Sequence, residues 1–325
     1  MQYPSQNGSD WNSAIAPHSS HPPVIPRVSA PEITPQIFQQ FYRPGTPLVV
    51  TGLLSDLNWN LETLNVLLGD IEFPIRCYGR SRYQQDKRQW TSAASGVAAR
   101  MMKFSEYVAC LQSGEAAQQD WYLAKCALSA TPLAQTPALE QVEARLGLRS
   151  PATGWNLWVG ANHLEQVHYD ASDGTLVQLQ GQKRVVLFPP SQLYNLYPSP
   201  LWKHLRHGLN VRAGQSYVYI EHPDFTAFPR FQQALKHRYE VLLNPGDLLF
   251  LPVGWWHEVT TVGTEPVCSI NRFWMPPSLR GWRSWSMWRV HLGSVLAMPH
   301  VLGELLSAVV SPERSAQLRK LFQKL

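Results

Sequence analysis

The chain lacks the features that would place it in a membrane or outside the cell. No run of about 18 apolar residues occurs among its 325 residues, so no transmembrane helix is expected. The N-terminus has no charged-then-apolar pattern typical of a secretory signal. The four cysteines show no paired spacing, which favours reduced thiols over disulfides. Together these absences predict a cytoplasmic protein.

The chain also lacks an internal repeat and an internal linker, so one large domain is the simplest organisation. A hydrophobic content of 44% is ample for a single core. Residues 1–33 are rich in Ser, Pro, His and Asn and are expected to form a disordered lead-in. The main domain is then predicted over residues 34–278, followed by a helical segment over residues 279–325.

The most informative motif is His168-Tyr169-Asp170, joined by His257 in a later run rich in proline and glycine. Two imidazoles and one carboxylate are the ligand set of a facial triad, which holds Fe(II) and leaves positions open for a co-substrate and O₂. An isolated His-x-Asp arises by chance, and a lone histidine is more often a structural residue than a ligand. The flanking segments therefore decide the interpretation.

Short strands surround both halves of the motif. Residues 175–180 alternate apolar and polar side chains, Gly181-Gln182 is typical of a type II′ turn, and residues 183–188 return as a second strand. This pattern predicts a β-hairpin that carries Lys183 near its turn, either as an exposed cation or as counter-charge to a carboxylate. Residues 239–243, 248–252 and 258–262 are further predicted strands.

Helical patterns are fewer and lie mainly upstream of the motif. Short helices are expected over residues 36–42, 61–68 and 104–112, with helix and loop over 133–148. Many short strands punctuated by Pro and Gly indicate an all-β sandwich or barrel. The predicted fold is therefore mainly β with flanking helices.

These segments resemble a known family in their order and spacing. The chain resembles the JmjC-type, cupin-like oxygenases that depend on Fe(II) and 2-oxoglutarate. That family includes an asparaginyl hydroxylase of hypoxia-inducible factor and a tRNA wybutosine hydroxylase. The resemblance covers residues 30–275 or so, and the matching stretches are residues 47–52, 121–123, 168–170, 178–190, 222–229, 244–252, 255–257 and 269–274.

The resemblance implies a double-stranded β-helix (jelly-roll) core and a complete site. His168, Asp170 and His257 would be the iron ligands. Lys183 and Tyr122 would bind the distal carboxylate of 2-oxoglutarate through charge-assisted and hydroxyl hydrogen bonds. Asn271 matches a strand position that often lines the site. The implied reaction consumes O₂ and 2-oxoglutarate and hydroxylates a substrate.

Two positions depart from the family pattern. Glu165 stands where relatives often have Ser or Thr, and its carboxylate would repel 2-oxoglutarate unless it is paired or turned away. Gly174 stands where relatives often have Asn. Members that serve only as binding modules usually lose a metal ligand, whereas this chain keeps all three. The intact set favours an active oxygenase over a non-catalytic binding module.

The C-terminal segment has a different composition. Trp282, Trp285 and Trp288 recur three residues apart among arginines, which predicts one aromatic helical face. Further helices are expected over residues 302–310 and 312–322. The tryptophans would pack on the core or on a second copy of the chain, which suggests a homodimer through C-terminal helices. A surface that stacks bases or contacts lipid is the alternative.

The charge balance bears on the substrate. The net charge is +5 and the isoelectric point is about 9.0, with one basic cluster over residues 203–207 and Arg212 and another over residues 76–88. Such clusters could attract an acidic substrate, RNA included, or simply be solvated. Two classes stay open: a hydroxylase of a protein or peptide side chain, and an oxygenase of a modified tRNA base or small metabolite. A histone demethylase is less expected, because the chain has no room for chromatin-reader domains.

Overall fold

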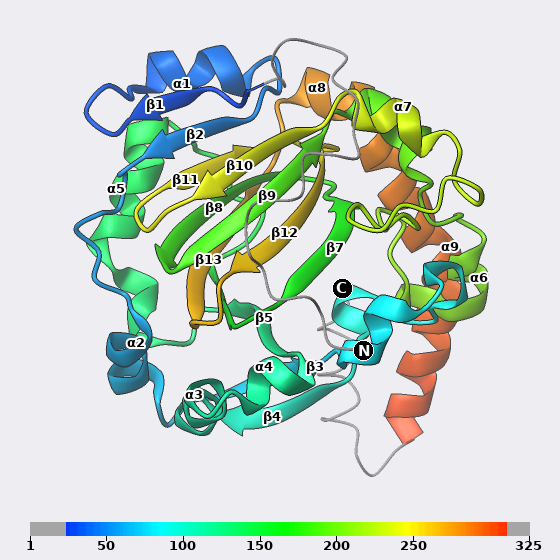
Figure 1. The fold of residues 1–325 in the computed structure, drawn as a ribbon, viewed down its shortest axis with the longest axis horizontal. Coiled ribbons are helices and arrows are strands. Elements are labelled where there is room, and N and C mark those ends of the chain that lie inside the picture. Colours follow the sequence, from blue (N-terminus) through cyan, green and yellow to red (C-terminus); the bar gives the residue numbers. More distant parts are fainter. Residues whose placement is uncertain (1–23, 311–325) are drawn as a thin grey trace.

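Two β-sheets dominate the computed structural model, which describes residues 24–310 (Figure 1). The strands are β1 (Arg27–Ser29), β2 (Leu48–Thr51), β3 (Glu72–Cys77), β4 (Ala99–Lys103), β5 (Trp121–Ala127), β6 (Asn156–Gly160), β7 (Leu164–Tyr169), β8 (Asp173–Gln180), β9 (Gln182–Phe188), β10 (Tyr239–Leu243), β11 (Leu248–Leu251), β12 (Trp256–Val262) and β13 (Val267–Trp274).

The larger sheet has nine strands in the order β1-β2-β11-β8-β13-β6-β5-β3-β4, and the smaller has four in the order β10-β9-β12-β7. From β6 to β13 the chain passes repeatedly from one sheet to the other, staying in the smaller sheet only between β9 and β10. This alternation is that of a double-stranded β-helix, so the predicted jelly-roll core is confirmed.

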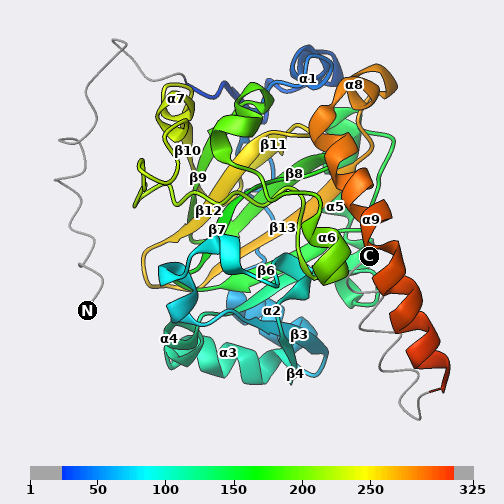
Figure 2. The ribbon, with the colours of Figure 1, turned by 90° about the vertical axis from the view of Figure 1, so that its right-hand side faces the viewer.

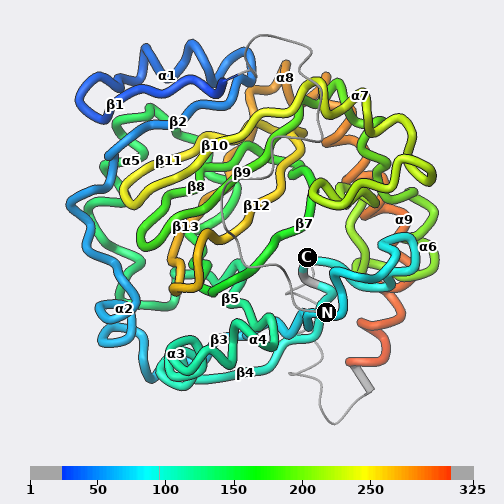
Figure 3. The backbone as a smooth tube through the Cα atoms, viewed as in Figure 1, coloured from blue at the N-terminus to red at the C-terminus, as the bar shows by residue number. Residues whose placement is uncertain are grey.

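The predicted hairpin over residues 175–188 is wrong, although both of its strands exist. β8 pairs with β11 and β13, whereas β9 pairs with β10 and β12 in the other sheet. Gly181 adopts φ +66°, as the turn pattern requires, but the turn forms an edge of the sandwich. Each strand gains two buried neighbours in its own sheet, which a two-stranded ribbon could not provide. Figure 3 shows the tight connections from β8 to β9 and from β10 to β11 at the same edge.

Helices cover the outside of the larger sheet. α2 begins where Asn60 accepts a hydrogen bond from the Thr63 backbone N–H, and it buries Leu61, Leu64 and Leu68 on one face. The helices are α1 (Pro35–Tyr42), α2 (Leu61–Leu68), α3 (Phe104–Gln112), α4 (Glu115–Gln119), α5 (Pro137–Leu146), α6 (Lys203–His207), α7 (Phe231–Leu235), α8 (Ser278–Arg283) and α9 (Trp285–Val310). Short 3₁₀ turns are η1 (Arg80–Gln84), η2 (Lys87–Gln89), η3 (Ala94–Gly96), η4 (Pro132–Gln135), η5 (Pro190–Leu196) and η6 (Gly208–Asn210).

The apolar core is divided by the sheets. The largest cluster joins the nine-stranded sheet to α1, α2, α3 and α5, and includes Phe38, Leu64, Tyr107 and Trp274. A second cluster packs the smaller sheet against the segment from η5 to α7, around Phe188 and Phe231. Because both outer faces are covered by apolar packing, polar side chains that point between the sheets can form a buried site.

The predicted C-terminal arrangement is wrong in two respects. Ser284 separates α8 from α9, so Trp282 and Trp288 lie on different helices and do not form one helical face. The tryptophans also do not pack on the core, since Trp282 is 71% exposed and Trp285 47%. The helix expected over residues 302–310 is the last part of α9, which continues through Pro299. The helix expected over 312–322 lies outside the described residues.

The N-terminal boundary also differs from the expectation. β1 pairs in parallel with β2, so residues 27–29 do not belong to a disordered lead-in as predicted for residues 1–33, and residues 1–23 lie outside the described part. Between residues 24 and 310, no helix combines the length and the apolar character needed to cross a bilayer.

Candidate metal centre

The three predicted ligands converge between the sheets. His168 on β7 and His257 on β12 are direct partners of the antiparallel ladder, and Asp170 follows β7 immediately. Ligand atoms of the three side chains all lie within 4.8 Å of one another, and the His257 Nε2 to Asp170 Oδ2 distance is 3.5 Å. Residues distant in sequence thus form one compact group, because two neighbouring strands carry it.

Both histidines have their tautomer set by the backbone. His168 Nδ1 donates to the Gln166 carbonyl at 2.7 Å, and His257 Nδ1 donates to the Trp255 carbonyl at 3.1 Å. Each Nε2 therefore keeps a lone pair for a metal ion. Burial lowers the pKa of His168 well below its usual value, with help from the nearby Arg212 and His257 charges, and burial also lowers the pKa of His257. Neutral imidazoles are the form that binds metal.

Asp170 has a positioned partner of its own. Arg212 Nη2 donates to Asp170 Oδ1, while Oδ2 faces His257. An outer partner of this kind orients a ligand carboxylate and leaves its second oxygen for the metal. Two nitrogen donors and one oxygen donor suit a divalent iron-type ion, and three protein ligands leave coordination positions open. In the part of the chain that the structure describes, this is the one cluster with such a donor set.

Lys183 is buried near the triad and is not an exposed cation. Its side chain is 2% exposed, and Nζ donates to Ser269 Oγ at 2.5 Å and to Tyr122 Oη at 3.4 Å. Burial lowers its pKa to about 8. Hydroxyl groups cannot neutralise an ammonium group, so this buried cation still has a place for an anion. Lys183 and Tyr122 are thus brought together as the sequence predicts.

Asn271 and Gly174 lie two register positions apart on the neighbouring strands β13 and β8, where Asn271 pairs with Leu176 and Phe273 pairs with Gly174. Asn271 is buried on β13, and its Oδ1 accepts a hydrogen bond from Trp158 Nε1 at 2.7 Å. Gly174 lies near the start of β8, where an added Cβ would find its nearest neighbour, the Leu251 carbonyl oxygen, at 3.8 Å. The backbone there has room for a side chain, so close packing does not explain this glycine.

Glu165 points toward the site and is paired. An irregularity in the β7–β12 ladder, between the His257–His168 and Val259–Glu165 pairs, gives β7 one extra residue. The Glu165 carboxylate lies 3.7 Å from His163 Nε2 and accepts a hydrogen bond from Tyr78 at 3.5 Å. Burial alone would raise its pKa, but His163 and the other nearby positive charges lower it to about 2.

His163 is the cation that compensates this carboxylate. Its Nδ1 lies 2.8 Å from Asp120 Oδ1, and Asp120 also accepts a hydrogen bond from Tyr83 at 2.6 Å. Burial opposes protonation, yet the two flanking carboxylates raise the pKa of His163. The imidazole stacks on Tyr122 with ring centroids 3.8 Å apart. The repulsion expected from Glu165 is therefore offset by a neighbouring positive charge.

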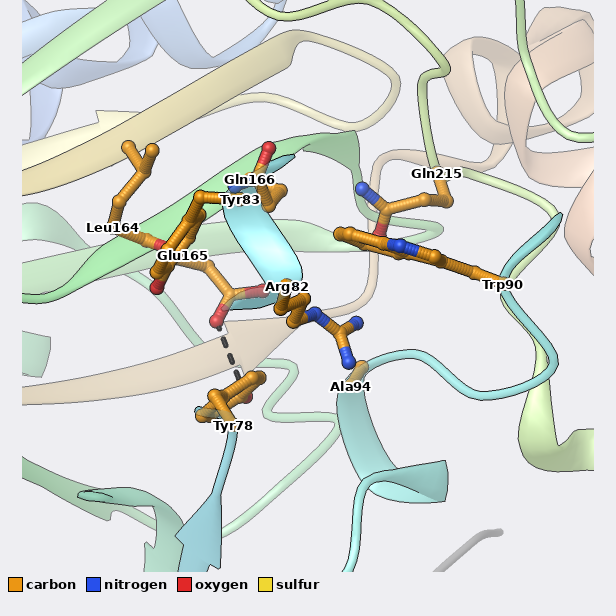
Figure 4. Close-up of a pocket in the computed structure, with 9 residues that line it drawn as sticks. All are labelled: Tyr78, Arg82, Tyr83, Trp90, Ala94, Leu164, Glu165, Gln166 and Gln215. Atoms are coloured by element: carbon orange, nitrogen blue, oxygen red, sulfur yellow. Dashed lines mark hydrogen bonds between the residues drawn. The ribbon is translucent and has the colours of Figure 1, made fainter. Parts of the chain in front are cut away.

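A small cavity adjoins this network on the side of η1. Figure 4 shows Tyr78 hydrogen-bonded to Glu165, with Arg82 and Trp90 across the opening. The Arg82 guanidinium lies 3.8 Å from the Trp90 ring centroid. Sequence reasoning missed Asp120, His163 and Tyr78, because they come from separate segments and no spacing pattern connects them.

Only part of the basic cluster predicted over residues 203–207 is exposed to solvent. Lys203 is buried and donates to the carbonyls of Arg88 at 2.6 Å and Trp90 at 3.2 Å. His204 is buried too and contacts the Gly208 carbonyl. In the second cluster, Lys87 is 1% exposed and donates to the Val218 carbonyl. Lys203 and Lys87 therefore attach loops to the fold, whereas Arg206 and Arg88 of the two clusters are exposed.

These observations define the class of protein. It has a jelly-roll fold that holds a buried His-Asp-His group and a more deeply buried lysine. A model of the cupin-like domain family matches residues 34–280, and the chain belongs to that family. The match begins just before α1 and ends in α8, so it includes every strand after β1 and every residue of the triad.

Individual relatives are similar over shorter stretches. Lysine-specific demethylase JMJ31 of Arabidopsis thaliana is 34% identical over 120 residues, covering 37% of this chain and 20% of that protein. tRNA wybutosine-synthesizing protein 5 of Homo sapiens is 35% identical over 127 residues, 39% of this chain and 32% of that protein. JmjC domain-containing protein D of Dictyostelium discoideum is 25% identical over 262 residues, covering 74% of this chain and 54% of that protein. The chain thus spans between a fifth and about half of these relatives' own lengths.

Replacing His163 tests the buried charge network. His163→Gln leaves Asp120 and Glu165 without their shared cation, and removing one partner of a buried ion pair typically costs about 3 kcal/mol of unfolding free energy. In the wild type the lowered Glu165 pKa stabilises the fold above its ordinary value of 4.5, and that contribution is lost as pH falls toward 2. The raised His163 pKa stabilises the fold below its ordinary value of 6.5, and that contribution is lost as pH rises through the folded value.

In the variant the carboxylates bind protons more readily, because no cation remains between them. Urea denaturation should therefore show a larger difference between wild type and His163→Gln at pH 6 than at pH 4. A difference that stays constant between these pH values would contradict the network.

Proposed function

We propose that this protein is an Fe(II)- and 2-oxoglutarate-dependent oxygenase that hydroxylates a side chain of a protein or peptide. The observation that carries the proposal is the intact His168, Asp170 and His257 group together with Lys183, whose buried ammonium contacts only neutral hydroxyls. A divalent ion and a dicarboxylate would satisfy both features at once. Membership of the cupin-like family agrees with this pairing.

The proposed reaction balances as substrate C–H plus O₂ plus 2-oxoglutarate giving substrate C–OH, succinate and CO₂. When bound, the iron and the co-substrate supply O₂ activation and oxidative decarboxylation. One oxygen atom enters the substrate and the other enters succinate. No further oxidant or reductant is needed.

In this proposal the side chains of the protein bind the metal ion and the co-substrate, orient them and exclude water from the site. His168 and His257 present neutral Nε2 atoms, and Asp170 offers one carboxylate oxygen while Arg212 holds the other. Lys183 and Tyr122 would fix the distal carboxylate of the co-substrate deep between the sheets, at the side of the site where all groups are buried. Fixing both ends of the co-substrate leaves the opposite face of the metal for the substrate.

The substrate class has less support than the reaction class. Relatives named as tRNA wybutosine-synthesizing proteins make a modified tRNA base the second candidate. A continuous basic surface would favour that candidate, but Lys203 and His204 point into the fold. The lysine-specific demethylases among the relatives keep a methylated lysine open as a peptide substrate. A small metabolite and a non-catalytic binding module have no observation of their own in their favour. The cytoplasmic location stays a prediction.

Anaerobic titration of the metal-free protein with Fe(II) and then 2-oxoglutarate tests the proposal. We expect a weak visible charge-transfer band of the chelate, which disappears on admitting air while succinate forms. His257→Ala removes one of three ligands and should lose both signals while the far-ultraviolet circular dichroism spectrum is retained. Absence of band and succinate in the wild type, or full iron-dependent turnover by His257→Ala, would reject the proposed site.

Lys183→Met tests the co-substrate position. The neutral side chain removes a buried charge-assisted bond, so the KM for 2-oxoglutarate should rise at least tenfold or so, the effect of losing roughly 1.5 kcal/mol or more. Lys203→Met is the matched control, since Lys203 is also buried but donates to backbone carbonyls away from the triad. Equal 2-oxoglutarate KM values for the two variants would remove Lys183 from the site.

We also propose that the protein is a homodimer that pairs through α9. Apolar side chains at Trp288, Leu292, Val295, Leu302 and Leu306 repeat at intervals of three, four and seven residues and are all exposed. Such spacing gives one apolar stripe along a helix and is typical of helix pairing. Figure 2 shows α9 extending beyond the sandwich, where a second copy could reach it. The alternative of base stacking requires basic charge along the stripe, and its five members are apolar.

Introducing positive charge into the apolar stripe of α9 should separate the two copies of the chain. The double variant Val295→Lys/Leu302→Lys is expected to behave as a monomer in sedimentation analysis, while the wild type sediments as a dimer. Ser307→Lys changes charge on the same helix at an exposed position away from the stripe and should stay dimeric. A wild-type monomer at micromolar concentration would exclude the proposed dimer.

A further inference from the structure

The face of α9 that packs against the fold carries a buried arginine. Arg289 is 6% exposed, whereas Trp288 and Leu292 on the other side of the helix are exposed. The Arg289 guanidinium donates from Nε to Tyr169 Oη at 3.3 Å and from Nη2 to the Ser199 carbonyl at 2.9 Å. Neither partner carries a negative charge, so little offsets the free-energy cost of removing this cation from water. An apolar side chain would fill the same place at lower cost, which indicates that the hydrogen bonds of Arg289 serve more than packing.

Tyr169 is the residue that links two of the proposed metal ligands. His168 precedes it and Asp170 follows it, and successive side chains of a strand point to opposite faces. The Tyr169 ring is therefore turned away from the metal site. It is fully buried and meets the Trp256 ring edge-on, with ring centroids 4.7 Å apart, while Arg289 binds its hydroxyl end. A rotation of the backbone at Tyr169 would move His168 and Asp170 together, so holding the ring also fixes both ligands.

A second arginine holds the other end of the connection that contains Asp170. Arg280 of α8 forms a bidentate pair with Asp173, in which the Nη1–Oδ1 and Nη2–Oδ2 distances are both 2.6 Å. Asp173 is fully buried at the start of β8, and its Oδ1 also accepts a hydrogen bond from the Val253 N–H at 2.8 Å. Bidentate arginine–carboxylate pairs fix direction as well as distance. The short connection over residues 170–172 is thus anchored by α9 through Tyr169 and by α8 through Asp173.

The turn before His257 contacts the same helix. Gly254 has φ +79°, and a Cβ atom at this position would lie 2.9 Å from the Ser286 Cβ of α9, so the turn and the helix are in close contact. The Gly254 N–H donates to the Asp170 carbonyl at 3.1 Å. The next residue, Trp255, supplies the carbonyl that fixes the His257 tautomer. Both segments that carry proposed metal ligands therefore pack against the C-terminal helices.

We propose that Arg289 is a positioning residue of the metal centre, which acts through Tyr169 on the ligand atoms of His168 and Asp170. Arg280 supports the same connection from its other end. This inference rests on the proposed metal site and adds to it a contribution from the C-terminal helices. Ligand atoms must be held to within about 0.5 Å of their binding geometry, so loss of an outer support weakens metal binding. The family model ends at residue 280, so Arg289 lies outside the matched residues.

The alternative is that Arg289 only attaches α9 to the fold. Lys203 has such an attaching role elsewhere, since it is 7% exposed and donates to two backbone carbonyls away from the triad. Loss of an attaching residue lowers stability and leaves metal affinity unchanged. Loss of a positioning residue changes metal affinity and the geometry of the bound ion, so the two roles are separated by measuring both quantities.

The test titrates the metal-free full chain with Co(II), whose visible absorption reports the number and geometry of its ligands. Arg289→Met should raise the Kd for Co(II) about tenfold, the lower end of the range for groups that orient metal ligands. Tyr169→Phe removes the phenol oxygen that accepts from Arg289 and should raise the Kd in the same direction. Because both changes break one connection, the double variant should bind Co(II) no more weakly than Arg289→Met. The Co(II) absorption spectrum should change in all three variants.

Lys203→Met is the matched control. It also removes a buried cation that donates to backbone carbonyls, so it should lower the free energy of unfolding in urea. Its Co(II) Kd and spectrum should stay at wild-type values. Circular dichroism and urea denaturation of each metal-free variant establish that the proteins compared are folded. Equal losses of Co(II) affinity in Lys203→Met and Arg289→Met would show that general loosening is the cause and would overturn the inference.

Two further results would overturn it. One is wild-type Co(II) affinity in both Arg289→Met and Tyr169→Phe. The other is a double variant in which the two effects add, because Arg289 would then not act through Tyr169. His257→Ala separates this failure from a failure of the metal site. If the wild type binds Co(II) and His257→Ala does not, the metal site stands whatever the result for Arg289. If the wild type binds no Co(II), the metal site and this inference fail together.

Discussion

The pairing of β7 with β12 is the constraint on which the rest of the site depends. It sets His168 opposite His257 in the ladder, and the chain leaves β7 with Asp170 on the same side. Backbone carbonyls two residues before each histidine then fix both imidazole tautomers. The two histidines therefore need no long-range side-chain contact, because strand geometry positions them and their backbone partners, whereas Asp170 is oriented by the side chain of Arg212. The apolar clusters outside the sheets stabilise that geometry from both faces.

The charge states of buried ionisable groups differ between two parts of the fold. Away from the triad, burial lowers the pKa of Lys87 and raises that of Glu258, so the interior favours their neutral forms. Next to the triad the opposite holds, since Asp120, His163 and Glu165 keep their charges by lying side by side. Tyr122 stacks on His163 of this chain of charges and also contacts Lys183. The Lys183 ammonium, bonded only to hydroxyls, remains the attractive feature of the interior for a carboxylate.

Sequence reasoning identified the parts of the site that lie on regular strands. The structure brings the three predicted ligands together and places Lys183 beside Tyr122, while their roles, which the family resemblance implies, stay predictions. The neighbours with which each strand pairs could not be predicted in the same way. The Gly181 turn looks like a hairpin locally, but pairing depends on strands more than 60 residues away, such as β11 and β13. The His163 network was missed for a similar reason, since its members join only after β5 and β7 pack together. Helix limits were predicted well at α2, where the Asn60 cap and the apolar spacing agree, and at α3, where apolar spacing marks the helix without a side-chain cap.

The difference between regular and irregular backbone also explains why the reaction class is easier to infer than the substrate. Groups for iron and co-substrate project from paired strands, whose spacing survives changes elsewhere. Arg212 and Arg82, by contrast, come from a loop and from the 3₁₀ turn η1. Loops and bulges tolerate insertion and re-aim side chains at little cost to the core. A family resemblance strongest in the strands therefore specifies the reaction class more closely than the substrate.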